Sequence, residues 1–224
     1  MTPASWPCPL PDGDISQEYA LAFDGGREHR LLIIPALFDE GNRLRRLTVE
    51  VMRRLDASGI DSVVPDLPGC NESLQQLERQ NVPGWFEATA AAARHFGATH
   101  VLGIRGGCLF TPQGLPTWHY VPAKAASILR QMIRARILAS REAGREEVRE
   151  RLSEMAPTSG IELAGYRLGA DFYRHFEPMV PDPAATVIAQ EAIGGSGLWL
   201  RAEPDEDSSQ ADALAAVLAR GMTS

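Results

Sequence analysis

The chain has 224 residues, of which 44% are hydrophobic and 23% are charged. This composition is ordinary for a soluble globular protein and suits a single α/β domain. Twenty-two basic and 29 acidic side chains give a net charge of −7, which argues against nucleic-acid binding by the whole chain. The sequence contains no run of about 18 apolar residues, so we expect no transmembrane span. The polar, proline-rich residues 1–14 do not resemble a secretory signal.

The three cysteines, Cys8, Cys70 and Cys108, are few and far apart in the sequence. Their spacing predicts neither a disulfide framework nor a zinc site, so we expect a reducing, cytoplasmic location. A metal site built from His119, His175 and the acidic residues 203–207 has no supporting ligand spacing. We therefore expect no metal and no cofactor.

The first half of the chain alternates between strand and helix signals. Residues 18–23 alternate in polarity, a glycine turn follows, and residues 31–34 are continuously apolar, which predicts a β-hairpin with a buried second strand. A helix capped by Asn42 is expected to run to about residue 57, because its leucines and valine share one stripe.

The same alternation continues through the middle of the chain. Residues 62–65 form a short buried strand, 66–81 a loop, a helix begins at Pro83 or Gly84 and ends at residue 95, and 99–104 form the next strand. This order predicts a mostly parallel sheet with helices on both faces.

The second half is less regular. The remaining expected elements are a strand at 118–121, helices at 123–140 and 145–155, an extended stretch at 160–166, a short helix at 170–176, strands at 186–190 and 198–202, and a final helix from Ser208 or Ser209.

Three strand ends carry the motifs that point to a fold family. The segments are Ile34-Pro35-Ala36-Leu37-Phe38-Asp39-Glu40-Gly41-Asn42-Arg43-Leu44-Arg45-Arg46, Pro65-Asp66-Leu67-Pro68-Gly69-Cys70-Asn71-Glu72-Ser73 and Gly103-Ile104-Arg105-Gly106-Gly107. With a weaker match at residues 163–168, they resemble α/β-hydrolase-fold proteins, in which a Gly-x-x-x-Gly bend follows a strand. More narrowly, they resemble the second hydrolase type associated with exosortase A (PEP-CTERM) loci.

Arg105 stands where a serine hydrolase of this fold carries its nucleophile. A guanidinium is not nucleophilic and stays charged at any cellular pH. The resemblance implies that arginine is usual here in that second type, so the chain would be a pseudoenzyme. No histidine follows the last expected strand, where the base of such a triad belongs. An active hydrolase or acyltransferase would need another nucleophile, Cys108, with His119 or His175 as its base.

Arg105 can instead bind a carboxylate or phosphate through two parallel hydrogen bonds. The accompanying binding candidates are Gly106, Phe38, Asp66 and Asp205. The competing interpretation is structural, with Arg105 paired to Asp39, Glu40 or Asp66, because a buried charge needs a partner in any case.

The segment from Cys108 to Thr117 contains two prolines and a glycine, and it is too short for a full crossover helix. We predict that the helix after the bend is missing or reduced to one turn. This would leave sheet surface uncovered, which a partner chain or a second copy could cover.

An arginine face on the helices at 123–140 and 145–155 could bind acidic lipid, polysaccharide or a partner. It comprises Arg130, Arg134, Arg141, Arg145, Arg149 and Arg151. A solvated face with i,i+4 pairs to Glu142, Glu146, Glu147 and Glu150 is the favoured interpretation.

We therefore expect one α/β-hydrolase-like domain over residues 1–224 with a cap-like helical insertion at 123–177. The resemblance implies an accessory protein of an exosortase/exopolysaccharide-linked system. It would bind a small anionic ligand or a protein partner. The alternatives are the active enzyme described above and a homodimerising structural subunit.

Overall fold

A computed structural model describes residues 1–201 and 203–223. Its centre is a seven-stranded sheet with the strand order β1-β2-β4-β3-β5-β6-β9. The strands are β1 (Thr2–Pro9), β2 (Ile15–Phe23), β3 (Arg30–Ile34), β4 (Asp61–Pro65), β5 (His100–Ile104), β6 (Thr117–Tyr120) and β9 (Thr186–Ile188). The five strands from β4 to β9 in this order are parallel, and β2 is antiparallel to β4. The expected mostly parallel sheet is confirmed.

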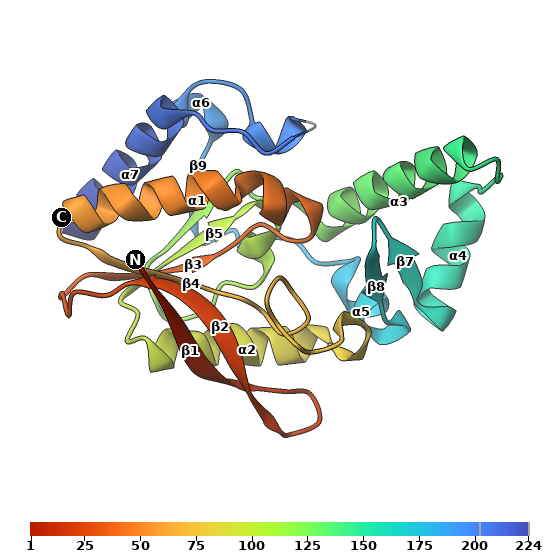
Figure 1. The fold of residues 1–224 in the computed structure, drawn as a ribbon, viewed down its shortest axis with the longest axis horizontal. Helices are drawn as coiled ribbons and strands as arrows, with labels where there is room; N and C mark the ends of the chain where they lie inside the picture. Colours follow the sequence, from red (N-terminus) through yellow and green to blue (C-terminus); the bar gives the residue numbers. More distant parts are fainter. Residues whose placement is uncertain (202, 224) are drawn as a thin grey trace.

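Helices cover both faces of this sheet, as the alternation predicted. Helices α1 (Asp39–Ala57) and α7 (Ser208–Thr223) lie on one face, and α2 (Val82–His95) lies on the other (Figure 1). Strand β3 is buried on both sides: Leu31 and Ile33 pack in the α1/α7 core, while Leu32 and Ile34 pack in the α2 core. No helix among the described residues is long and apolar enough to cross a bilayer.

The antiparallel hairpin is present, but its strands are not the expected ones. Strand β2 pairs with β1 along its whole length, whereas β3 pairs only with the parallel strands β4 and β5. The prolines of β1 hid this strand from sequence reasoning. They are tolerated because β1 is an edge strand with one free side.

Two helix starts also differ from expectation. Helix α1 begins at Asp39 after Phe38, so Asn42 lies within its first turn and is not the cap. Helix α2 begins at Val82, because the Asn81 side chain accepts a hydrogen bond from the backbone N–H of Gly84 at 2.7 Å.

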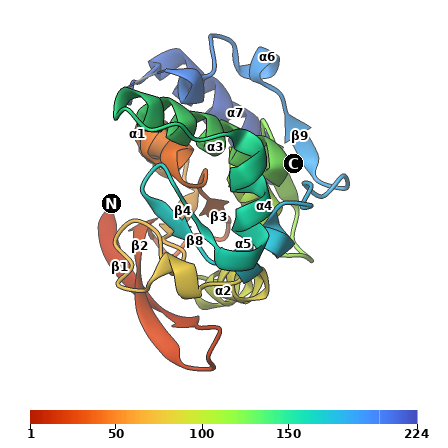
Figure 2. The ribbon, with the colours of Figure 1, turned by 90° about the vertical axis from the view of Figure 1, so that its right-hand side faces the viewer.

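Between β6 and β9 the chain builds an arm beyond the carboxyl edge of the sheet (Figures 1 and 2). It contains α3 (Ala125–Glu142), α4 (Arg149–Ser159), the hairpin β7 (Ile161–Leu163) with β8 (Tyr166–Leu168), and α5 (Ala170–Phe176). The single extended stretch expected at 160–166 is thus the first strand and turn of a hairpin. The helix expected from residue 145 begins four residues later.

The late elements are shorter than expected. Strand β9 ends at Ile188, and a one-turn helix α6 (Gln190–Ile193) follows. The strand expected at 198–202 is wrong for residues 198–200, which form the 3-10 helix Leu198–Leu200; Ala202 lies outside the described residues. A further 3-10 helix, Leu77–Arg79, lies in the loop before α2.

The helix after the bend is reduced, as predicted, to the 3-10 helix Arg105–Leu109. The expectation that this leaves the sheet uncovered is wrong. Val101 and His119, on the affected face of β5 and β6, are fully buried. Leu109 and Phe110 from the short segment pack into the core with Val101 and close the surface.

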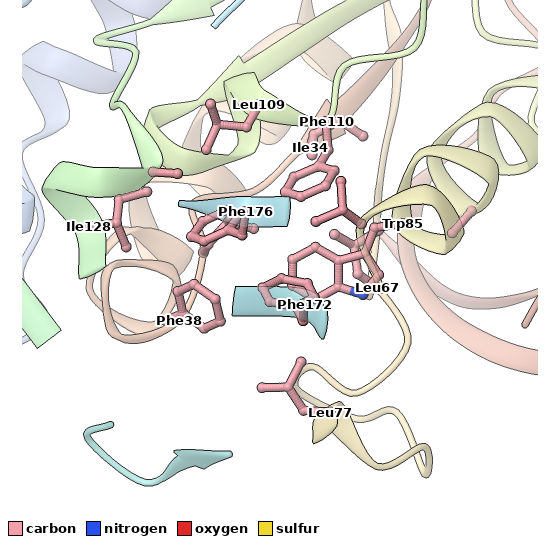
Figure 3. Packing of buried hydrophobic residues seen from close by; sticks show 14 of the residues in the cluster. Ile34, Phe38, Leu67, Leu77, Trp85, Leu109, Phe110, Ile128, Phe172 and Phe176 are labelled. Atoms are coloured by element: carbon pink, nitrogen blue, oxygen red, sulfur yellow. The ribbon is translucent and has the colours of Figure 1, made fainter. Parts of the chain in front are cut away.

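An aromatic cluster joins this segment to α2 and the arm (Figure 3). The Trp85 ring lies 5.0 Å from that of Phe110 and 4.9 Å from that of Phe172, and Phe110 stacks on Phe176 at 6.1 Å. Each of these four side chains is fully buried. The arm is therefore anchored to the sheet layer by large apolar contacts, which dominate core stability.

The outer end of the arm depends on Glu147, which accepts hydrogen bonds from Arg136 and Ser140. The Arg136 bonds, followed by that of Ser140, lower the pKa of Glu147 to about 2. A carboxylate with a lowered pKa stabilises the fold above its ordinary pKa, and this contribution is lost as pH falls toward 2. We expect Glu147→Gln to speed amide hydrogen exchange in residues 140–160 at pH 7, and wild-type exchange protection there to fall between about pH 4.5 and 2.

The matched control is Glu146→Gln, because Glu146 is exposed and next in sequence. Equal effects of the two substitutions would contradict the role of Glu147.

Candidate functional site

The bend after β5 has the geometry of a sharp strand-to-helix turn. Arg105 follows the strand with φ of 52°, in the left-handed region that side chains other than glycine rarely adopt. Gly107 approaches β3 so closely that an added Cβ would lie 2.3 Å from the carbonyl oxygens of Ile34 and Pro35. The turn therefore requires glycine at this position.

The Arg105 guanidinium is directed into the protein. Its Nε and Nη2 donate to the two carboxylate oxygens of Glu40 at 3.1 and 2.9 Å, and its Nη1 donates to the carbonyl oxygen of Val121 at 3.1 Å. The guanidinium carbon lies 4.4 Å from the ring centre of Trp199. Of the three partners expected from the sequence, Glu40 is the one that binds. With side chains 15% and 7% exposed, the two residues form a buried ion pair.

Four corners at the carboxyl edge of the sheet share the same backbone strain. Phe38, Asn71, Arg105 and Val121 follow β3, β4, β5 and β6, and their φ values lie between 45° and 55°. Each such residue other than glycine costs about 1–3 kcal/mol unless its surroundings hold it in place. Arg105 bonds to Glu40, two residues after the strained corner at Phe38, and directly to Val121, so it joins three of these loops.

The space beside Arg105 is filled by apolar side chains. A Cβ on Gly106 would lie 2.8 Å from Cδ1 of Ile128 and 3.0 Å from Cγ of Leu37. Phe38 is 6% exposed, and its ring packs against those of Tyr166 and Phe176. Of the two residues expected to bind a ligand here, Gly106 is packed against Ile128 and Leu37, and Phe38 packs against Tyr166 and Phe176.

Among the described residues, no hydrogen bond joins Cys108 to either of its candidate bases, His119 and His175. Cys108 is buried, and burial raises the pKa of its thiol well above the usual range. His119 is fully buried; burial lowers its pKa, and its Nε2 lies 3.1 Å from Oγ1 of Thr111. His175 is exposed on α5, with Nδ1 2.9 Å from the carbonyl oxygen of Asp171.

The two acidic candidates also lie apart from the guanidinium. Asp66 is buried, accepts a hydrogen bond from the Asn71 amide at 2.8 Å, and has its pKa raised by burial. Asp205 is exposed and pairs with Arg201; the backbone N–H of Glu206, followed by that arginine, lowers its pKa. Within 1–201 and 203–223, no three histidine, cysteine or acidic side chains are arranged to hold a metal ion.

The arginine face of the arm is exposed, and in the part of the chain that the structure describes none of the expected i,i+4 ion pairs is present. Arg134 and Arg141 are exposed. Glu147 pairs instead with Arg136, eleven residues away, across the turn between α3 and α4. The interpretation of this face as a binding surface remains a prediction.

Sequence reasoning missed two contributors to the site. Trp199 was assigned to a strand, and nothing in its neighbourhood indicated a ring facing Arg105. Val121 contributes only its carbonyl oxygen, which no side-chain pattern reveals. Glu40 was one of three acidic residues expected as a partner, because a buried charge needs one, and the sequence did not separate it from Asp39 and Asp66.

No family model matches this sequence, and no curated protein sequence does. Among solved structures, mouse alpha/beta hydrolase domain-containing protein 10 is similar over 100% of this chain and 99% of that one, at 11% identity and a TM-score of 0.59. The bottromycin epimerase BotH, solved with bottromycin A2, matches over 99% and 100%, at 14% identity and a TM-score of 0.57. The esterase Est1E of Butyrivibrio proteoclasticus matches over 78% and 70%, at 16% identity and 0.50.

The chain has the α/β-hydrolase fold. The chain spans 44 to 61% of the length of several other hydrolases and esterases that it matches. In this fold the residue at the bend is the nucleophile, and the next residue supplies an oxyanion-hole N–H. In this chain those positions are Arg105 and Gly106.

Breaking the buried pair should be costly, because removing one partner leaves an uncompensated charge. We expect Arg105→Met and Glu40→Gln each to lower the free energy of unfolding by about 3 kcal/mol. The double variant should lose less than the sum of the two. Urea unfolding measures all three, with Arg134→Met, at an exposed arginine of the arm, as the control within about 0.5 kcal/mol of wild type. Single losses no larger than this control would contradict a structural pair.

The buried thiol of Cys108 should be inert, because only the thiolate reacts. We expect iodoacetamide at pH 8 to leave Cys108 unmodified in the native protein and to alkylate it in urea, as measured by peptide mass spectrometry. Rapid native alkylation of Cys108, with Cys8 still protected, would show an activated nucleophile.

Proposed function

We propose that this protein is a catalytically inactive, accessory form of the α/β-hydrolase fold, which binds a ligand or partner and does not hydrolyse one. The observation that supports this most directly is the closed pair of Arg105 with Glu40 at the nucleophile position. A nucleophile must be free to attack, and its base must lie within hydrogen-bond reach. Arg105 meets neither condition.

The surroundings of the bend support the same proposal. Ile128 and Leu37 occupy the space beside Gly106, where a substrate carbonyl would need room. His119 is directed to Thr111 in a fully buried position. Replacing Arg105 by a hydroxyl would therefore supply one part of a triad and leave the others missing.

The cellular system in which the protein would act is inferred from the sequence resemblance alone. The segments around Phe38, Asp66 and Arg105 resemble the second exosortase-associated hydrolase type, which implies an accessory role in an exosortase/exopolysaccharide-linked system. A reducing, cytoplasmic compartment suits the three cysteines, which are all free thiols.

A small anion on Arg105 is the narrower alternative. Such an anion would have to displace Glu40, whose carboxylate already takes two of the guanidinium hydrogen bonds. We therefore place ligand binding elsewhere on the protein. A thermal-shift series with carboxylates and sugar phosphates should show no stabilisation that depends on Arg105.

Hydrolysis of short-chain p-nitrophenyl esters and thioesters tests the proposal itself. We expect no turnover above background from wild type, from Arg105→Ser or from Cys108→Ala, and no labelling by a fluorophosphonate. The three proteins are compared at equal folded fraction, checked by circular dichroism. Wild-type turnover that disappears in Cys108→Ala would overturn the proposal in favour of an active enzyme.

A further inference from the structure

A cavity of about 150 Å³ opens at the carboxyl edge of the sheet, beside the bend but separate from Arg105. Its walls come from residues 35–38 after β3 and from Leu67, Cys70 and Asn71 after β4. Asn42 of α1 and Tyr166 of β8 complete the lining. Leu37 and Phe38 lie between the two places, but neither Arg105 nor its partner Glu40 lines this cavity.

The cavity lies where the chain topology changes direction. The loop after β3 leads to α1 on one face of the sheet, and the loop after β4 leads to α2 on the opposite face (Figure 1). Adjacent parallel strands whose loops diverge in this way leave a crevice outside their carboxyl ends, and ligands of open α/β sheets bind there. Two of the strained corners, Phe38 and Asn71, lie in this crevice.

The polar side chains of the cavity can both donate and accept hydrogen bonds. The Asn71 amide nitrogen donates to Asp66 at 2.8 Å, and the Asn42 amide nitrogen donates to the Tyr166 hydroxyl at 3.5 Å. Asn42 and Asn71 are both exposed residues. Two amides and a phenol suit a ligand that carries hydroxyl groups, because a hydroxyl also donates and accepts.

The charges around the cavity disfavour an anion. No lysine, arginine or histidine lines it. Asp39 and Asp66 lie close enough to act on its lining: after burial, Asp39 is the next cause that raises the pKa of Tyr166, and Asp66 the next that raises the pKa of Cys70. Arg43 pairs with Asp39, and Arg45 lies close enough to Asp66 to lower its pKa, so the charge of each arginine is opposed by a carboxylate.

The remaining wall is apolar and aromatic. It comprises Leu37, Phe38 and Leu67, and the Phe38 ring continues into the aromatic cluster (Figure 3). The Phe38 and Tyr166 rings lie 5.3 Å apart, edge to face. A volume of about 150 Å³ is large enough for a single benzene ring.

We propose that this cavity binds one uncharged six-membered ring that carries hydroxyl donors, with its flat face on the Leu37–Phe38–Leu67 wall and its hydroxyls on Asn42 and Asn71. The inference rests on the proposed binding function and assigns it a site and a ligand class. The same chemistry occurs in a phenol and in a sugar ring, so both are tested.

Binding is measured by two-dimensional NMR titration of the full chain with catechol, methyl glucoside and benzoate. We expect catechol or methyl glucoside, and not benzoate, to shift amide signals of residues 35–42 and 67–71. The neutral ring that binds more tightly shows whether the cavity takes a phenol or a sugar. Preference for benzoate, or shifts confined to other regions, would overturn the proposal.

Two substitutions at one position provide the matched test. Cys70→Leu adds bulk to the cavity and should reduce affinity more than tenfold, whereas Cys70→Ser keeps its volume and should bind within about twofold of wild type. Asn42→Leu removes one acceptor on an exposed helix position and should weaken binding about fivefold. Unchanged affinity in Cys70→Leu would place the ligand elsewhere.

The outcomes separate this inference from the proposed function. Absence of ring binding, with no ester turnover, overturns the cavity assignment and leaves the proposal of a catalytically inactive protein standing. Ester turnover overturns the proposal of a catalytically inactive protein, whatever binds in the cavity.

Discussion

A single buried cation holds the carboxyl edge of this sheet together. Arg105 reaches Glu40 in the first turn of α1 and the carbonyl of Val121 after β6, while its flat face lies against Trp199. The loops it joins contain strained backbone, and strain of this kind persists only where neighbouring contacts fix it. The position of Glu40 near the positive end of the helix dipole makes it a suitable anion for this contact. The position that carries the nucleophile in hydrolases of this fold is occupied here by a residue that links three loops of the sheet edge.

The broad architecture could be predicted because its signals are local. Apolar runs at β3, β4 and β5, separated by the amphipathic patterns of α1 and α2, specify a parallel sheet with helices on both faces. The loss of the crossover helix was also predictable, because the spacing of Pro112, Gly114 and Pro116 leaves no room for it. The Gly-x-x-x-Gly segment identified Arg105, and the loops after β3 and β4 supplied its three candidate acidic partners.

What sequence reasoning missed depends on contacts between distant segments. Strand β1 has Pro3, Pro7 and Pro9 at alternate positions, a pattern that only an edge strand accepts, and the identity of an edge is set by the whole sheet. Trp199 lies 94 positions after the arginine it stacks on, in a segment with strand-like composition. The β7–β8 hairpin turns at Ala164 and Gly165, both with positive φ, and alanine gave no turn signal.

The contact between Ile128 and the bend changes how the arm is understood. Ile128 belongs to the first turns of α3, yet it packs against Gly106 at the centre of the carboxyl edge. The arm therefore packs into the interior where it leaves the sheet. Residues 123–177 supply Ile128, Phe172 and Phe176 to the buried core, which a detachable lid would not do.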